Sequence, residues 1–359
     1  MKGPVEIDGS LGEGGGQVLR TALSLSMATG RVLRIVNIRA GRAKPGLANQ
    51  HLTCIKAARQ ICAAEVSGAE LGSQSLAFEP GEVCAGDYSF DVRTAGSVSL
   101  VLQTVFLPLS FAKRESSVTI RGGTHVRWSP SYEFLEDQWL FYMQKIGFSI
   151  SLRLERAGYY PQGGGILKAG IRPADDVLPL ALSDRGELER VVGRVFISNL
   201  KEAIAARQAE KAEQILASRG LSAEIEVREY ASPGAGTGTH LRAAFENGSG
   251  SYTSLGERGV PAERVASLSA ECVADYIDSG AAVDRFIADQ LVLPLCFARG
   301  ESFFTCEQVT MHLLTNAKVV EMFVPVRVNV DGEVRRPGQV RIIPAQAEEN
   351  GGRPFCERT

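Results

Sequence analysis

The sequence lacks the features that mark several large classes of protein. Its seven cysteines are odd in number and include no CxxC pair, which argues against a disulfide framework and against a zinc cluster. The formal net charge is only -2, so any nucleic-acid partner must be held by a local basic site. No basic leader precedes an apolar segment, and no apolar run approaches about 18 residues. We therefore expect a soluble, intracellular, cytoplasmic protein with no membrane partner.

Histidine is scarce as well, with four residues in 359. One of them, His312, lies in the otherwise apolar stretch 309–320. A lone histidine in such a stretch is most often a satisfied core residue. A histidine at a dry site can instead act as an acid, a base, a metal ligand or a nucleophile, and its neighbours decide which.

An internal repeat indicates how the chain is organised. The length and the 44% hydrophobic content predict two domains, or one large domain with an insertion. Residues 105–116 align without gaps on residues 291–302, with seven of twelve positions identical at an offset of 186. Pro108 and Pro294 fall at the same point of the two copies, where each should kink or end a helix. A fainter third copy begins at Leu19, so we expect three related α/β units that begin near residues 15, 95 and 281.

The spacing between copies is uneven. The extra residues before the third copy predict an inserted α/β domain over residues 183–277. Within it, the pattern predicts strands over 190–198, 223–230 and 241–246, helices over 203–219 and 261–279, and a loop over 232–239. The helix 203–219 is charged on most faces, which is typical of a solvated surface helix. The expected division is a repeat domain over 1–182 and 278–344, the insertion over 183–277, and a disordered or loosely attached tail over 345–359.

A glycine turn near the N-terminus is a candidate phosphate site. Residues 12–16 are glycine apart from Glu13, and they precede a helix expected over 17–28. Backbone amides at a helix start suit a phosphate, and the carboxylate could hold a divalent ion. The turn matches neither GxGxxG nor GxxxxGK[ST], which excludes a Rossmann or P-loop interpretation. A plain turn is an equal alternative.

A basic loop follows at residues 38–46. Arg39, Arg42 and Lys44 lie within six residues, in a loop stiffened by one proline, and Gln50 and His51 follow at the start of a helix. Two arginines can grip phosphate oxygens in a bidentate manner. An anion site and a solvated basic loop are equally good interpretations.

The repeat itself singles out three polar residues. Aligning the copies places Arg20, Gln103 and Asp289 at one equivalent position, with Gln290 beside the last. Polar groups within apolar helices are costly to bury unless they are paired. Either the three residues face a common cleft, or they form a polar network that locks the units together.

A group of rings follows the second copy. Trp128, Pro130, Tyr132 and Phe134 come close together in the sequence, and Phe286 precedes Gln290 by four residues. Flat apolar surfaces of this kind can sandwich a nucleobase, although a core role is more common.

Four of these segments together resemble the RNA 3'-terminal phosphate cyclase family. They are residues 12–17, residues 38–46 with Gln50 and His51, residues 288–294, and residues 312–316; the resemblance runs from about residue 5 to residue 343. It implies an α/β (α+β) fold of three repeated βαβαββ modules, with a smaller α/β domain inserted before the third. It also implies an enzyme that uses ATP to convert an RNA 3'-phosphate end into a 2',3'-cyclic phosphodiester, releasing AMP and pyrophosphate.

The resemblance also assigns roles to residues. It implies that His312 is the nucleophile that carries AMP and that Glu13 holds a divalent metal, Mg or Mn. Residues matched to phosphate or RNA binding are Arg20, Arg39, Arg42, Gln50 and His51. Residues matched to the ATP site are Gln103, Phe286, Ile287, Ala288, Asp289, Gln290, Pro130 and Phe134. Of these, Phe286, Pro130 and Phe134 would pack on adenine, and Asp289 could orient His312.

Two other functions remain open from the sequence. The family has a paralogous branch that serves ribosome assembly without cyclase activity and lacks the nucleophilic histidine, so the presence of His312 counts against it. An enolpyruvyl transferase resembles this chain in its repeated modules but needs neither ATP nor a covalent histidine.

Overall fold

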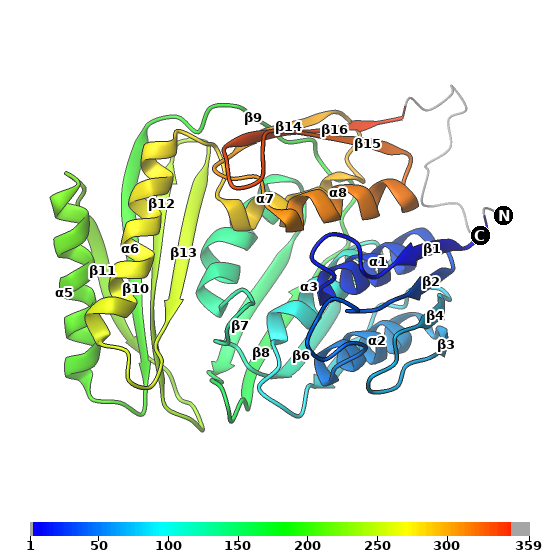
Figure 1. Ribbon diagram of the computed structural model, residues 1–359, viewed down its shortest axis with the longest axis horizontal. Coiled ribbons are helices and arrows are strands. Elements are labelled where there is room, and N and C mark those ends of the chain that lie inside the picture. The colour runs from blue at the N-terminus through cyan, green and yellow to red at the C-terminus, as the bar shows by residue number, and fades with distance from the viewer. Residues whose placement is uncertain (1–2, 346–359) are drawn as a thin grey trace.

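A computed structural model describes residues 3–345, and most of the expected tail over 345–359 lies outside them. The first module lies at the right of Figure 1, next to the N label, and is a four-stranded sheet with two helices. Its elements in chain order are β1 (Val5–Asp8), α1 (Gly16–Thr29), β2 (Leu33–Val36), α2 (Asn49–Cys62), β3 (Glu65–Ser67) and β4 (Leu76–Glu79). The strands are ordered β1-β2-β4-β3, with β1 and β2 parallel and the other pairs antiparallel.

Two further modules repeat this topology. The second contains β5 (Asp87–Asp91), α3 (Val98–Ser110), β6 (Ser116–Gly122), the π-helical stretch η1 (Phe134–Trp139) that continues as α4 (Leu140–Lys145), β7 (Ile150–Arg156) and β8 (Gly165–Ile171). The third contains β9 (Ala181–Leu182), α7 (Arg285–Leu295), β14 (Ser302–Cys306), α8 (Met311–Phe323), β15 (Val326–Asp331) and β16 (Gly338–Pro344). Their sheets are ordered β5-β6-β8-β7 and β9-β14-β16-β15. The prediction of three βαβαββ modules is therefore confirmed.

The segment between β9 and α7 forms a fourth unit. It contains β10 (Leu188–Ser198), α5 (Glu202–Ser218), β11 (Ala223–Glu229), β12 (Gly236–Phe245), β13 (Ser249–Leu255) and α6 (Ala262–Ser279). The sheet order is β11-β10-β12-β13, and α5 and α6 pack on each other and on the sheet (Figure 1). Buried residues such as Leu241, Tyr252 and Tyr276 form a hydrophobic cluster separate from the main core. We propose that this unit is the inserted domain, with α6 extending its end to Ser279.

The loop predicted over 232–239 is wrong in its second half, because β12 already begins at Gly236. A Cβ atom at Gly236 would lie 2.2 Å from a ring carbon of Tyr159, and one at Gly238 would lie 2.4 Å from the ring of Phe196. The glycines therefore leave room for aromatic rings against the strand. In the sequence alone they are indistinguishable from turn residues.

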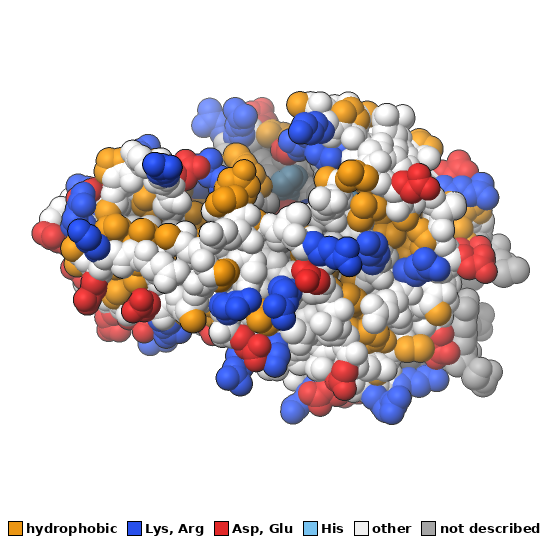
Figure 2. All heavy atoms as spheres, turned by 90° about the horizontal axis from the view of Figure 1, so that it is seen from below, with side chains coloured by type: hydrophobic (Ala, Val, Ile, Leu, Met, Phe, Trp, Pro, Cys, Tyr) orange, Lys and Arg blue, Asp and Glu red, His pale blue; other side chains and the backbone are white. Residues whose placement is uncertain are grey.

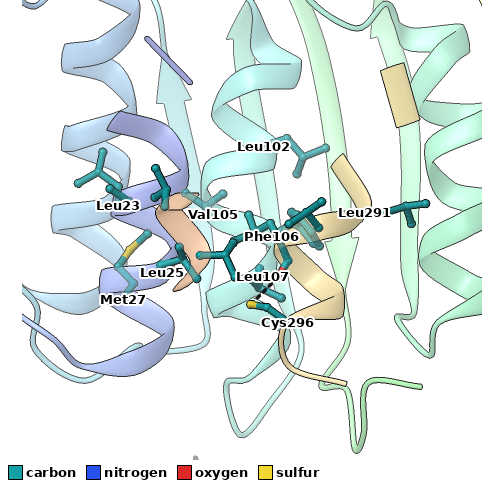
Figure 3. Close-up of a cluster of buried hydrophobic side chains, with 14 of the residues drawn as sticks. Leu23, Leu25, Met27, Leu102, Val105, Phe106, Leu107, Leu291 and Cys296 are labelled. Carbon is teal, nitrogen blue, oxygen red and sulfur yellow. Dashed lines mark hydrogen bonds between the residues drawn. The ribbon is translucent and has the colours of Figure 1, made fainter. Parts of the chain in front are cut away.

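The main core lies where helices of the three modules meet. Figure 3 shows apolar side chains of α1, α3 and α7 pointing toward one another, among them Leu25, Phe106 and Leu291. The sheets lie on the outside of these helices (Figure 1). Pro108 and Pro294 each fall within the last turn of their helix, as the repeat predicts. Within residues 3–345 the cysteines are all free, and no helix there is long and apolar enough to cross a membrane.

Asp284 fixes the start of α7, the helix that carries residues 286–290. Its fully buried carboxylate accepts hydrogen bonds from the Phe286 and Ile287 amides at 2.7 and 2.8 Å. It also accepts from Gln138 Nε2 at 2.8 Å and from the Ser251 amide at 3.1 Å. One side chain thus joins the second module, the insertion and the third module.

We expect Asp284→Ala to lower the free energy of unfolding by about 2 kcal/mol or more, because it removes a helix cap and leaves buried donors unpaired. Thr310→Ala is a matched comparison, since Thr310 caps α8 through a single hydrogen bond from the Leu313 amide. That change should cost about 1 kcal/mol. Denaturant unfolding measures both, and equal losses would contradict the joining role of Asp284.

Candidate active site

A cavity of about 420 Å³ lies where α1, α3, α7, α8 and the start of η1 converge. Figure 2 shows the molecule hollowed on one face, with a histidine side chain visible inside and Lys or Arg side chains near the edge. The residues at the matched repeat positions, Arg20, Gln103 and Asp289, all line this cavity. Gln103 also donates a hydrogen bond of 2.5 Å to Gln290, so it links α3 to α7 as well.

His312 is the second residue of α8 and lies at the cavity wall. Its side chain is 50% exposed, whereas His51, His125 and His240 are all buried. Its Nε2 atom lies 3.4 Å from Glu13 Oε2, and its Nδ1 atom lies 3.8 Å from Asp289 Oδ2. The second distance is too long for a hydrogen bond. The ring is therefore accessible to a molecule in the cavity, which a core histidine would not be.

Gln17 connects Asp289 to the helix that carries the histidine. Its Nε2 atom donates to Asp289 Oδ2 at 3.3 Å and to the His312 carbonyl at 3.1 Å. Asn316 donates to the Asp289 carbonyl at 2.9 Å and accepts from the Thr21 hydroxyl at 2.8 Å. Asp289 thus contacts α8 through two amide side chains.

Charge and burial set the protonation states of His312 and Asp289. Burial lowers the pKa of His312; Glu13 raises it in opposition, and Arg20 and Arg42 lower it further. Burial raises the pKa of Asp289 to about 8, helped by Asp284 and opposed by Arg20. At neutral pH the imidazole is therefore mostly neutral, with a lone pair available, and Asp289 is largely uncharged.

A different histidine, His51, belongs to α2 and is buried, with its ring against the start of α1. The backbone amide of Ala48 donates to His51 Nδ1 at 3.0 Å, so the ring proton is on Nε2. Burial lowers the pKa of His51 to about 3, with smaller effects from Arg20 and Arg39. A Cβ atom at Gly16 would lie 2.1 Å from His51 Nε2 and 2.9 Å from Arg20 Nη1. Glycine at this position lets a neutral donor and a cation approach the same helix start.

Arg20 supplies an uncompensated cation to this helix start. It is partly buried, and within the described chain its guanidinium donates no hydrogen bond and forms no ion pair. Burial of the guanidinium lowers its pKa, and the nearby Cys54 and Asp289 oppose this effect. An anion bound in the cavity would offset that cost.

The basic loop 38–46 borders the same region. Arg42 Nη2 lies 3.6 Å from Glu13 Oε2, and both side chains are about half exposed. Arg39 donates to the Gly46 carbonyl at 2.8 Å, which leaves its remaining donors available. Gln50 clamps the start of α3, since it accepts from the Ser97 amide at 3.1 Å and donates to the Ser97 carbonyl at 3.3 Å.

Part of the cavity lining is apolar. Pro130, Phe134 and Phe286 line it, and Phe286 remains 48% exposed. Ile287 and Ala288, which the sequence placed in the same site, are fully buried and face the core. The cavity lining therefore combines flat apolar faces with polar and cationic groups.

Comparisons with known proteins agree with this arrangement. A family model described as RNA 3'-terminal phosphate cyclase matches residues 11–330. The chain belongs to the RNA 3'-terminal phosphate cyclase family. The protein of that name from Methylococcus capsulatus is 45% identical over 348 residues, which cover 94% of this chain and 96% of the relative. Those from Ralstonia nicotianae and Methanopyrus kandleri are 46% and 42% identical, covering 92% and 95% of this chain and 94% and 99% of the relatives.

Two residues of this cyclase-family site were not selected from the sequence. Gln17 and Asn316 lie in the segments 12–17 and 312–316 that carry the resemblance, and both line the cavity. Neither side chain titrates, so a search for acids, bases and nucleophiles passes over them. Their contacts with Asp289 and Thr21 join the first and third modules, nearly 300 residues apart in sequence.

The charges around His312 predict opposite pKa changes in two variants. Because Glu13 raises the pKa of His312, Glu13→Gln should lower it below the wild-type value. Because Arg42 lowers it, Arg42→Gln should raise it. NMR titration of the His312 ring signals in the wild type and in both variants would measure both changes. A rise in Glu13→Gln would contradict the assigned electrostatics.

Proposed function

We propose that this protein converts the 3'-phosphate of an RNA end into a 2',3'-cyclic phosphodiester, using ATP and releasing AMP and pyrophosphate. The observation that carries the proposal is the position of His312. It is a half-exposed, neutral imidazole on the wall of a cavity that also presents apolar rings suited to a base and a cation suited to phosphates. Relatives named RNA 3'-terminal phosphate cyclase, similar along nearly the whole chain, support it.

The reaction would proceed in three steps. A lone pair of His312 attacks the α-phosphorus of ATP, the bond to the β-phosphate oxygen breaks, and pyrophosphate leaves. An oxygen of the RNA 3'-phosphate then attacks the phosphorus of the histidyl-AMP, and the P–N bond breaks to regenerate the imidazole. Finally the terminal 2'-hydroxyl attacks the 3'-phosphorus, loses its proton and expels AMP. This last step is favoured because nucleophile and phosphorus are on one ribose.

The residues on the cavity wall fit these steps. Pro130, Phe134 and Phe286 offer apolar faces to adenine, and Gln103 and Gln290 offer amides at its edge. The uncompensated Arg20 and the Nε2–H of His51 would bind phosphate oxygens at the start of α1.

The loop over 38–46 would bind the terminal phosphate of the RNA. Arg42 and Arg39 keep donors available there, whereas Gln50 acts by fixing the neighbouring start of α3. Asp289 would position His312 indirectly, through Gln17 and Asn316.

The residues near His312 also fit a divalent metal of the hard, oxygen-binding type. Among residues 3–345 no group of three or more metal-binding side chains is present, but Glu13 offers one half-exposed carboxylate beside the phosphate region. Magnesium and manganese commonly bind through one carboxylate together with substrate phosphates and water. Glu13 would hold the ion, which supplies neutralisation of phosphate charge.

The alternative functions fit these observations less well. A scaffold for ribosome assembly would not require an accessible histidine with a lowered pKa facing a cavity. An enolpyruvyl transferase would share the repeated modules, but the family match is to the cyclases.

The direct test is incubation with ATP, a divalent metal and an RNA that bears a labelled 3'-phosphate. We expect the label to become resistant to alkaline phosphatase as the cyclic ester forms. An RNA with a terminal 2'-deoxyribose is the matched control: its adenylated end would also resist phosphatase but would retain AMP, so product mass separates it from the cyclic ester. If a folded, ATP-binding protein leaves the label sensitive to phosphatase, the proposed activity is incorrect.

A further inference from the structure

Trp128 differs from every other residue around the cavity. It lines the same cavity as Arg20 and His312, yet its side chain is 95% exposed, more than that of any other large hydrophobic residue in the described chain. Its backbone is in the left-handed region, with φ of 63°. That conformation is disfavoured for a residue with a Cβ atom, and exposing an indole forgoes a large burial gain. The strained backbone and the exposed indole both lower the stability of the free protein, which is expected where the side chain contacts a ligand.

The turn that presents Trp128 is fixed on both sides. Before it, Arg127 forms an ion pair with Glu257 of the insertion. After it, the Ser129 hydroxyl donates to the Val126 carbonyl at 3.0 Å. The neighbouring Pro130 carbonyl also accepts a hydrogen bond, of 2.8 Å from Ser99 at the start of α3. The indole is therefore held outward by a rigid frame at the cavity edge.

The position of Trp128 indicates which ligand it serves. The apolar part of the cavity lining already offers three partly or fully buried faces, from Pro130, Phe134 and Phe286, which suffice for one base. A second substrate must reach His312 from solvent, past the rim. A single-stranded RNA end carries a base next to the phosphate that reacts, and exposed aromatic rings beside cationic groups are the usual way to hold such strands.

We infer that Trp128 is the stacking platform for the base of the RNA 3'-terminal nucleotide. This inference rests on the proposed cyclase function and adds an RNA-binding residue to it. Stacking accepts every base, so Trp128 would bind RNA ends without regard to sequence. It would complement the contacts that Arg39 and Arg42 offer to the terminal phosphate.

The protein carries its own reporter for this contact. It contains two tryptophans, and the other, Trp139, is only 1% exposed. Acrylamide should therefore quench Trp128 and leave Trp139 largely unaffected. We expect a short RNA with a 3'-phosphate to shield the quenchable fluorescence, and ATP alone to leave it accessible. Trp128→Phe, which should lack the quenchable component, confirms the assignment of the signal.

Steady-state kinetics provides the second readout. Trp128→Ala should raise the KM for RNA by roughly 5- to 150-fold, the range expected for one lost base stack, with a much smaller change in the KM for ATP. Trp128→Phe should recover part of the loss because it keeps an aromatic face. Tyr160→Ala is the control, since Tyr160 is 81% exposed and does not line the cavity. It should leave both constants unchanged.

Two outcomes would overturn the inference. Saturating RNA that leaves the acrylamide quenching unchanged would exclude a base on Trp128. Shielding by ATP alone would assign the indole to adenine instead. Failure of the proposed function has a different signature, namely no phosphatase-resistant product from the wild type, while the fluorescence assay still reports whether RNA binds at Trp128.

Discussion

His312→Ala is expected to reduce RNA cyclisation by about 10⁴-fold or more while the protein still folds and binds ATP. The reduction is large because no other nucleophile lies at the same point of the cavity, and loss of a covalent nucleophile removes the first step altogether. Folding should be little affected, since the side chain is half exposed and forms no hydrogen bond through its ring within residues 3–345.

The measurement is the rate of formation of phosphatase-resistant RNA ends, with thermal unfolding and equilibrium ATP binding as controls. A variant that binds ATP and retains a tenth of the wild-type rate would contradict the nucleophilic role. If His312→Ala does not fold, its loss of activity says nothing about catalysis. His312→Gln, which keeps a polar side chain of similar length, therefore serves as the second variant.

Gly16→Ala is expected to produce the next largest effect, a loss of about 100-fold in the same assay. The new methyl group would lie 2.1 Å from His51 Nε2 and 2.9 Å from Arg20 Nη1, so both of the groups that we propose to bind phosphate must move. Displacement of about 1 Å at a reacting site can cost two orders of magnitude in rate. The higher helix propensity of alanine offsets part of the free energy lost by moving the buried His51 ring, and thermal unfolding measures the remaining loss of stability.

A control glycine separates this effect from a general effect of alanine. At Gly86, which lies just before β5, the nearest atoms to a new Cβ are those of Tyr88 at 3.6 Å, an ordinary contact. Gly86→Ala should therefore retain full activity. If Gly16→Ala is as active as the wild type, the close approach of His51 to α1 does not matter for catalysis.

The sequence predicted the architecture well because the chain repeats itself. A repeated helix with a proline at a fixed point reports a repeated structural unit, and equivalent positions of such units occupy equivalent places in the fold. The alignment of Arg20, Gln103 and Asp289 thus anticipated that three helices line one cavity. The sequence left open whether these residues face a cleft or lock the modules together; all three line the cavity, and Gln103 also pairs with a polar side chain of another repeat, Gln290 next to Asp289.

Within the segment 286–290, helical geometry decides which side chains reach the cavity. Phe286, Asp289 and Gln290 follow the spacing i, i+3, i+4 and share one face, whereas Ile287 and Ala288 point into the core. Helical periodicity could have made this distinction from the sequence, because the segment begins an expected helix. Assigning the whole segment 286–290 to the site, as the family resemblance does, overlooks this distinction.

Other features depended on contacts that no local pattern reveals. Gln17 and Asn316 bridge the first and third modules, so their role appears only once the chain has folded. The same holds for Gly236, whose lack of a side chain accommodates a ring from another module. The exposure of Trp128 was also hidden, because an aromatic residue near others in sequence most often belongs to a core.

The most direct test of the account is whether the protein becomes covalently labelled by ATP. The protein would be incubated with ATP labelled at the α-phosphate and a divalent metal, denatured, and assayed for bound label, with His312→Ala alongside. We expect label on the wild type only, in a bond that is lost in acid and survives alkali, as a phosphoramidate should. A folded wild type that binds ATP but retains no label, or a label that persists in His312→Ala, would contradict the histidyl-AMP intermediate.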